Sequence, residues 1–378
     1  MLDYPTLKVI WWLLVGVLLV GFAIMDGHDM GVGTLLPFVG KGDEERRVVI
    51  NTVGPHWDGN QVWFITAGGA VFAAWPFVYA IAFSGLYWAL LLVLCALFFR
   101  PVGFEYRSKM PSPTWRKGWD AGIFAGSAVP ALVFGVAFGN LLQGVPFSLD
   151  DTLRSHYSGS FWALLNPFAL LCGVVSVAML TLQGATYLAH RTQGDVQRRA
   201  KQAVGVAAGA VVAGFAGAGM VVTRLNGYVI RSIGDVGGTL HPLMKEVVRE
   251  PGAWLASFQH LPLLWALPAL ALVAAVLAWL AVRSGHTLMG FVASSLVCAG
   301  VILTAGVALF PFVLPSSEMP NASLTAWDAT SSHHTLWVMF WVALIFTPIV
   351  LAYTGWAYRV MRGPMTRERI TANDKAFY

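Results

Sequence analysis

The dominant feature of this sequence is a series of apolar stretches, each long enough to cross a lipid bilayer as a helix. A membrane-spanning helix needs about 18 or more apolar residues, and several stretches of this 378-residue chain are longer. Charged residues make up 11% of the chain, whereas a soluble globular domain carries about 25%. The pattern predicts an all-α integral membrane protein and argues against a soluble enzyme, a nucleic-acid-binding protein or a disordered regulator.

We expect nine transmembrane helices in a single transmembrane domain over residues 1–378. The second segment is the weakest of the nine, because polar residues and Pro55 interrupt it. Without it, hydropathy alone would leave eight spans. The predicted spans cover residues 8–38, 46–73, 76–100, 120–142, 160–189, 203–223, 261–282, 287–313 and 335–358.

The Lys and Arg residues orient these spans. With nine spans and the N-terminus outside, in the periplasm, 18 of the 24 Lys and Arg residues fall on the cytoplasmic side. Cytoplasmic loops of membrane proteins are enriched in these residues, so we also expect a cytoplasmic C-terminus. The net charge of +5 then reflects topology and not a nucleic-acid partner. Three longer hydrophilic loops, about 143–159, 224–260 and 314–334, lie outside.

The cysteines and histidines give little sign of a metal or haem site. Cys95, Cys172 and Cys298 all lie inside apolar segments, where a free cysteine behaves as a small hydrophobic residue. His28 and His56 are the histidines placed well inside the predicted membrane region. Two histidines that face one cavity can ligate a haem, but no motif supports this here. We therefore expect no disulfide and no metal site in this chain.

Most ionisable residues inside the predicted spans belong to the first three spans. Asp26 and Asp29 of DGHDMGVG are three residues apart and share a helix face, while His28 points elsewhere. In the second span, GPHWDGNQVW places Asp58 deepest, near the middle of the membrane. The third span ends with Glu105 at the cytoplasmic rim. Such a graded series of carboxylates suits proton conduction, because each one can accept and release a proton.

Two other interpretations of these carboxylates stay open. They can be static polar groups that pair with Arg100 or satisfy helix interruptions, since an ionisable group in a membrane is costly and needs a partner. They can also form the coupling site of a proton-coupled secondary transporter. Transporters commonly contain internal repeats, whereas only one half of this chain carries membrane charges, which argues against that class.

Several long segments resemble subunit II of bacterial cytochrome bd ubiquinol oxidases, most closely the proteobacterial bd-I type. The resemblance runs in the same order from about residue 1 to residue 360. Strings of this length are far more specific than a short motif. The segments are WWLLVGVLLVGFAIMDGHDMGVG, GPHWDGNQVWFITAGGAVFAAWP, FFRPVGFEYRSK, GNLLQGVPF, FPFVLPSS and NASLTAWDATSS.

The resemblance implies a nine-helix subunit of a bacterial inner-membrane complex that oxidises ubiquinol and reduces O₂ to water. It implies that the haem-binding subunit I ligates haem b and haem d, and that this chain has no haem ligands and is inactive alone. It also implies small single-span accessory subunits and membrane lipid as partners. Some members hold ubiquinone as a structural ligand.

The resemblance assigns a role to two of the carboxylates. Asp58 in PHWDGNQ and Glu105 in GFEYRSK match positions on the family's cytoplasmic proton path, and the spacing adds Asp29 and Asp26 to the same path. Glu105 departs from the family, where Asp is common, and the departure lengthens the side chain by one methylene. The carboxylate is kept, so the resemblance still implies its role on the path, with a changed reach.

The resemblance bears on aromatic positions as well. Trp63 matches a tryptophan near a lateral oxygen route, and we expect Trp57 and His56 on this route or at the subunit interface. His28 stands where the family often has Phe, so no family role extends to it. A purely structural membrane subunit is the alternative to a proton-conducting one, and the two differ little in fold.

Overall fold

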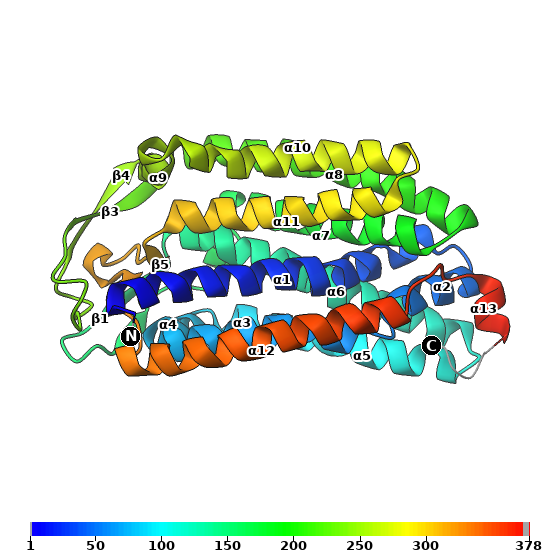
Figure 1. Cartoon of the computed structure of the whole chain (residues 1–378), viewed down its shortest axis with the longest axis horizontal. Coiled ribbons are helices and arrows are strands. Elements are labelled where there is room, and N and C mark those ends of the chain that lie inside the picture. Colours follow the sequence, from blue (N-terminus) through cyan, green and yellow to red (C-terminus); the bar gives the residue numbers. More distant parts are fainter. Residues whose placement is uncertain (1, 373–377) are drawn as a thin grey trace.

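The structure, a computed structural model, describes residues 2–372 and 378. Long helices form a bundle along one axis, with α1 through its middle (Figure 1). Lys375, one of the cations predicted on the cytoplasmic side, lies outside the described residues. The long helices are α1 (Tyr4–Val39), α3 (Trp57–Ala74), α5 (Tyr87–Tyr106), α6 (Pro113–Gln143), α7 (Pro167–Arg191), α8 (Gly194–Val222), α10 (Ala266–Arg283), α11 (Thr287–Leu309) and α12 (His333–Val360). The shorter helices are α2 (Asp43–Val53), α4 (Pro76–Gly85), α9 (Ala256–His260) and α13 (Arg367–Ala372).

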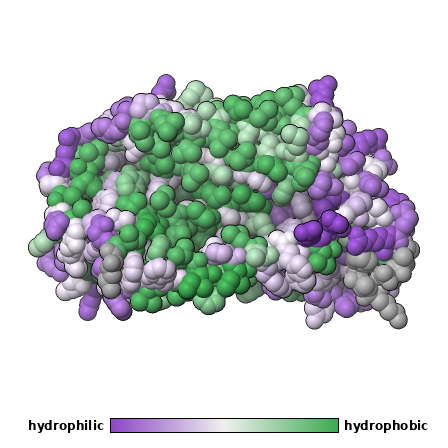
Figure 2. Space-filling model, viewed as in Figure 1, coloured by the Kyte–Doolittle hydropathy of each residue, from purple (hydrophilic) through white to green (hydrophobic). Residues whose placement is uncertain are grey.

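The helices carry the apolar surface expected of a membrane protein. Among the described residues, 8 helices are long and apolar enough to cross a bilayer, and α3 with α4 makes a ninth if this pair, bent by 119°, is one span. Apolar side chains cover the middle of the visible face, and hydrophilic residues gather at both ends (Figure 2). A mostly helical, multi-pass membrane protein is therefore confirmed.

The second and third predicted spans are not single continuous helices, and this part of the prediction is wrong. The helix expected over 46–73 is two helices, because α2 ends at Val53 and α3 begins at Trp57. Pro55 lies in the break between them, and its ring lacks the backbone donor that a continuous helix needs. His56 therefore stands at the N-cap of α3 and not within a helix. The segment 76–100 is likewise divided into α4 and α5, which meet at Leu86.

The prediction of an all-α chain omits small two-stranded antiparallel sheets in the three long loops. The strands pair as β1 (Phe147–Leu149) with β2 (Ser155–Tyr157), β3 (Asn226–Ser232) with β4 (Glu246–Pro251), and β5 (Phe312–Leu314) with β6 (Leu324–Thr325). The labelled strands and α9 lie at one end of the bundle, and α2 and α13 lie at the other (Figure 1). The three loops thus share one end, as the predicted topology requires.

Glycines allow α1 to lie in the middle of the bundle. A Cβ atom added at Gly31 would lie 2.0 Å from the carbonyl oxygen of Leu180 in α7. One added at Gly21 would lie 2.4 Å from the ring of Trp63 in α3. Small residues permit such close approach in membrane helix pairs, whose association depends on van der Waals packing. Helix α1 is thereby fixed against both α7 and α3.

The long loops are held against α1 by buried lysines. Lys245 Nζ lies 2.8 Å from Asp328 Oδ2, and both side chains are 1% exposed. Burial lowers the pKa of Lys245, and the charge of Asp328 opposes this shift. Lys8 of α1 donates hydrogen bonds to the carbonyl oxygens of Trp327 at 2.7 Å and Val236 at 3.0 Å. Because a buried charge is costly without its partner, these contacts fix the loops at this end.

The cation distribution and the common position of the three loops generate a topology prediction. We expect Met244→Cys to react with a membrane-impermeant maleimide in intact spheroplasts, and Lys117→Cys to react only after the membrane is opened. Both native side chains are exposed, so the side of the membrane decides which one reacts. The parent chain, whose Cys95, Cys172 and Cys298 lie within helices, is the control. Equal labelling of both variants in intact spheroplasts would contradict the nine-span topology.

Candidate functional site

The carboxylate of Asp26 belongs to a buried ion pair with Arg100 of α5. The guanidinium donates to both carboxylate oxygens, from Nη2 at 2.6 Å and from Nη1 at 3.2 Å. Both side chains are almost fully buried. A guanidinium that binds a carboxylate through two parallel hydrogen bonds forms a strong pair and fixes its geometry. The geometry of Asp26 therefore agrees with the interpretation that it is a static polar group paired with Arg100.

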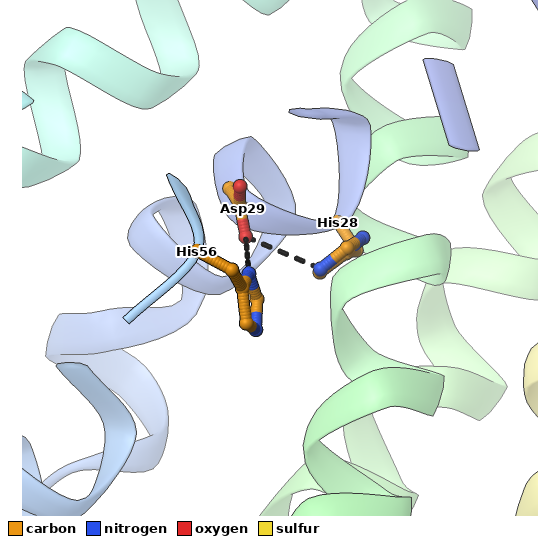
Figure 3. A group of neighbouring side chains, drawn as sticks. All are labelled: His28, Asp29 and His56. Atoms are coloured by element: carbon orange, nitrogen blue, oxygen red, sulfur yellow. Dashed lines mark ion pairs between the residues drawn. The ribbon is translucent and has the colours of Figure 1, made fainter. Parts of the chain in front are cut away.

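Asp29 lies in a second buried group, with His28 of α1 and His56 at the start of α3 (Figure 3). Its Oδ1 lies 3.2 Å from His28 Nε2 and 3.9 Å from His56 Nδ1, and its Oδ2 accepts a 2.8 Å hydrogen bond from Asn60 Nδ2. The expectation that His28 points away from Asp29 is wrong. Neighbouring residues of a helix diverge by about 100°, but the imidazole is long enough to bring its Nε2 back to the carboxylate.

Two tyrosines connect this group to α7 and α12. His56 Nε2 lies 2.9 Å from Tyr187 Oη. Tyr358 Oη donates a 2.9 Å hydrogen bond to Asn60 Oδ1, and it lies 3.4 Å from His28 Nε2 and 3.3 Å from His56 Nδ1. Nothing in the sequence marks Tyr187, and Tyr358 belongs to an aromatic-rich helix end that is typical of a membrane interface. The contacts of both residues appear only in the folded chain.

Asp58 and Glu105 lie outside this buried group. Both side chains are exposed on the surface of the single chain. The enclosed carboxylate beside the break at residues 54–56 is therefore Asp29, whereas Asp58 is exposed, and the depth of Asp58 in the membrane stays a prediction. Asp58 belongs to the first turn of α3, and Glu105 to the last turn of α5.

Tyr378 brings these two carboxylates together. Its backbone nitrogen donates to Asn51 Oδ1 at 2.9 Å, and Asn51 Nδ2 donates to its carbonyl oxygen at 2.9 Å. Burial raises the pKa of Tyr378, and a hydrogen bond to Glu105 and the charges of Glu105 and Asp58 raise it further, while a hydrogen bond with Trp57 lowers it. The structure thus groups Asp58, Trp57 and Glu105 around one phenol.

The residues expected at an oxygen route or a subunit interface share the start of α3. Trp63 and Trp57 are half-buried and pack against the central core of the bundle. The ring of Trp57 lies 5.8 Å from that of Phe104 in α5, measured between centroids. His56 is buried in the group with Asp29. Their role in oxygen access or subunit contact stays a prediction.

The surroundings of His28 and His56 do not fit a haem. Their ring centroids are 5.6 Å apart, and a haem held by two histidines needs room for a flat macrocycle between them. The side chains of Asp29, Asn60 and Tyr358 occupy this region, through the contacts given above. These residues leave the two imidazoles joined by a polar network and not separated by a slot.

Comparisons with known proteins agree on one family. A family model described as cytochrome bd terminal oxidase subunit II matches residues 7–361. The chain is 58% identical to cytochrome bd-I ubiquinol oxidase subunit 2 of Escherichia coli (strain K12), with 100% of both chains covered. It is 34% identical to cytochrome bd ubiquinol oxidase subunit 2 of Bacillus subtilis (strain 168), over 93% of this chain and 95% of that protein.

A solved structure shows the same fold. The match is to the bd oxidase from Geobacillus thermodenitrificans, with a TM-score of 0.65 and 15% sequence identity, and it covers 95% of this chain and 98% of that chain. The fold, the order of the motifs and the full-length identity point the same way. This chain belongs to the cytochrome bd terminal oxidase subunit II family.

Proposed function

We propose that this chain supports the haem-binding subunit I without ligating haem, and that it delivers protons from the cytoplasm toward the oxygen-reducing site. As a family member, the chain is subunit II of a cytochrome bd-type quinol oxidase, an oxidoreductase complex that includes a partner subunit I. We place the complex in the bacterial inner membrane, with the N-terminus of this chain in the periplasm and the C-terminus in the cytoplasm. The exposure of Asp58 on an apolar helix carries the proposal of proton delivery.

Helix α3 presents Asp58 on a surface that is mostly apolar, with Thr66 exposed and Gln61 half-buried. Its neighbours Val62 and Ile65 are 50% and 65% exposed. A carboxylate that faces lipid is costly, so another protein has to cover this face, and subunit I is the partner that the family supplies. A Cβ atom added at Gly59 or Gly69 would have nothing within 4 Å, so a second helix can approach closely. Asp58 then lies at the subunit boundary, where it can pass a proton to subunit I.

Glu105 and Asp29 extend this proposed route in opposite directions. Tyr378 is a neighbour of both Glu105 and Asp58. A proton that enters at Glu105 therefore passes one side chain, that of Tyr378, before it reaches Asp58. Asp29 is the buried acceptor, bonded through Asn60 to the same helix that carries Asp58. Asp26 is held by Arg100, and we assign it the role of positioning charge beside Asp29.

The other proposed components follow from the family and the exposed surface. We assign haem b and haem d to subunit I, because the residues around His28 and His56 do not fit a haem. Helix α12 is exposed along most of its length and offers a surface for lipid or a small single-span accessory subunit. Ubiquinone as a structural ligand, and oxygen access near Trp63, belong to the same proposal.

A purely structural subunit is the competing proposal. The bidentate pairing of Asp26 with Arg100 favours it, since that pair needs no proton transfer to explain it. The exposed Asp58 and Glu105 favour proton delivery, because carboxylates inside a membrane protein that no buried cation neutralises are commonly functional. The comparisons do not favour a secondary transporter.

The poor fit of a haem between His28 and His56 generates a prediction. We expect His28→Ala and His56→Ala to leave the haem b and haem d absorbance of the purified complex unchanged per assembled complex. Neither imidazole ligates iron in the proposal, so no haem depends on it. The measurement is the reduced-minus-oxidised spectrum with pyridine haemochrome quantification. Loss of one b-type haem from a complex that still contains both subunits would show that the assignment to subunit I is wrong.

The two exposed carboxylates generate a prediction on turnover. We expect Asp58→Asn to lower quinol-driven O₂ consumption per haem d by at least about tenfold. This is less than the rate factor of about 10²–10⁴ that a group transferring a proton in the reaction typically contributes. Glu105→Gln should lower it less, because water at the rim can replace its proton transfer. Glu105→Asp should be nearly neutral, since it keeps the titratable group. The matched control is Asp151→Asn, an exposed carboxylate of the loop between β1 and β2.

Two outcomes would contradict this turnover prediction. If the complexes with Asp58→Asn and Glu105→Gln assemble and keep the parent rate at every pH, both carboxylates are structural. An equal loss in Asp151→Asn would instead point to a general effect of surface charge. The pH dependence of turnover should change in Asp58→Asn and stay unchanged in Asp151→Asn.

A further inference from the structure

We propose that His28, Asp29 and His56 form a binding site for a divalent transition-metal ion, with the hydroxyl of Tyr358 at a fourth position. His28 and Asp29 belong to α1, His56 caps α3, and Tyr358 comes from α12. The ligand atoms of the first three residues all lie within 4.8 Å of one another, and their side chains converge on a common point (Figure 3). The site joins three helices in the buried interior of the subunit.

The distances between the donor atoms suit a small tetrahedral ion. Zinc binds nitrogen and oxygen at about 2.0–2.1 Å, so neighbouring donors around it lie about 3.3 Å apart. Asp29 Oδ1 lies 3.2 Å from His28 Nε2 and 3.9 Å from His56 Nδ1. Tyr358 Oη lies 3.4 Å and 3.3 Å from the same two nitrogens. The ligand atoms of His28 and His56 lie within 4.8 Å of each other, so the two imidazoles would move together to share one ion.

The outer hydrogen bonds fix both histidines in the form that binds metal. His28 Nδ1 lies 2.9 Å from the Ile24 carbonyl oxygen, which can only accept, so Nδ1 carries the hydrogen and Nε2 presents a lone pair. Tyr187 Oη donates its hydrogen to the Thr52 carbonyl oxygen at 3.1 Å. His56 Nε2, 2.9 Å from Tyr187 Oη, must therefore donate, which leaves a lone pair on Nδ1. Metal-binding histidines are oriented by outer partners in this way.

Lone pairs on Asp29 Oδ1 and His28 Nε2 therefore face each other, with too few hydrogen-bond donors between them. Asp29 Oδ1 is buried and has no hydrogen-bond partner among the described residues. Asn60 Nδ2 supplies hydrogens to Asp29 Oδ2 at 2.8 Å and to His56 Nδ1 at 3.0 Å, but it reaches neither Oδ1 nor His28 Nε2. A positive species between His28 and Asp29 would satisfy both atoms. Two imidazoles and a carboxylate prefer zinc or a neighbouring first-row metal over Mg²⁺ or Ca²⁺.

The proposed metal and a transferable proton would compete for Asp29 Oδ1. A metal ion binds the deprotonated carboxylate and releases any proton held there. Zinc at this site should therefore slow the delivery of protons, a consequence that rests on the proposed function. The metal site itself does not rest on it, so metal content and turnover are measured separately.

The test uses the purified whole complex. After incubation with ZnSO₄ and desalting, zinc per complex is measured by inductively coupled plasma mass spectrometry. We expect His28→Phe, which keeps an aromatic ring, and Asp29→Asn to lose one zinc per complex relative to the parent. His260→Ala removes an exposed histidine of α9 and should retain the parent content. Equal zinc content in the parent, His28→Phe and Asp29→Asn would overturn the proposal and leave a proton as the species between His28 and Asp29.

A second measurement covers variants that do not assemble. The haem spectrum reports assembly, and the zinc K-edge X-ray absorption of the parent complex reports the ligands directly. A shell of nitrogen and oxygen at about 2.0 Å with scattering from two imidazoles supports the site. A shell without imidazole scattering, or one dominated by sulfur, overturns it. If zinc binds as proposed but turnover is unaffected, the metal site stands and the proton route through Asp29 falls.

Discussion

A polar or charged side chain can be buried in a membrane only where other protein groups satisfy it, and the interior of this subunit follows from that constraint. Helix α1 carries two buried carboxylates, at Asp26 and Asp29. Arg100 of α5 neutralises the first, and Asn60 of α3 donates to the second. The helices that supply these partners must pack closely around α1, and glycines such as Gly31 allow backbones to approach it.

The break in the helix at Pro55 helps to satisfy the same constraint, because it supplies polar partners to a buried carboxylate. A proline inside a continuous helix leaves a carbonyl without its usual donor, and here the chain instead ends α2 and starts α3 anew. The new start sets His56 at a helix cap and Asn60 one turn later, both facing the carboxylate of Asp29. The same turn directs Asp58 outward, to a surface that a partner subunit can cover. One break thus supplies both the buried polar group and the exposed carboxylate.

Much of the architecture could be predicted because it depends on local sequence. Apolar stretches long enough for a bilayer set the helices, and the family motifs identify subunit II. Hydropathy averages over a short break, so it does not reveal that the predicted spans 46–73 and 76–100 are divided at residues 54–56 and at Leu86. The strands in the loops were missed because each is short and pairs with a segment separated from it in the sequence.

The sequence by itself determined the membrane class, the family and the carboxylates that need an explanation, because hydropathy, composition and motif order are properties of neighbouring residues. The tertiary structure decided which of those carboxylates are paired and which are exposed. Tyr187 and Tyr358 reach His56 across 131 and 302 positions of the chain, and no local pattern encodes such contacts. The tautomers of His28 and His56 depend on these partners as well. A buried polar group takes its chemistry from the atoms around it, and only folding brings those atoms together.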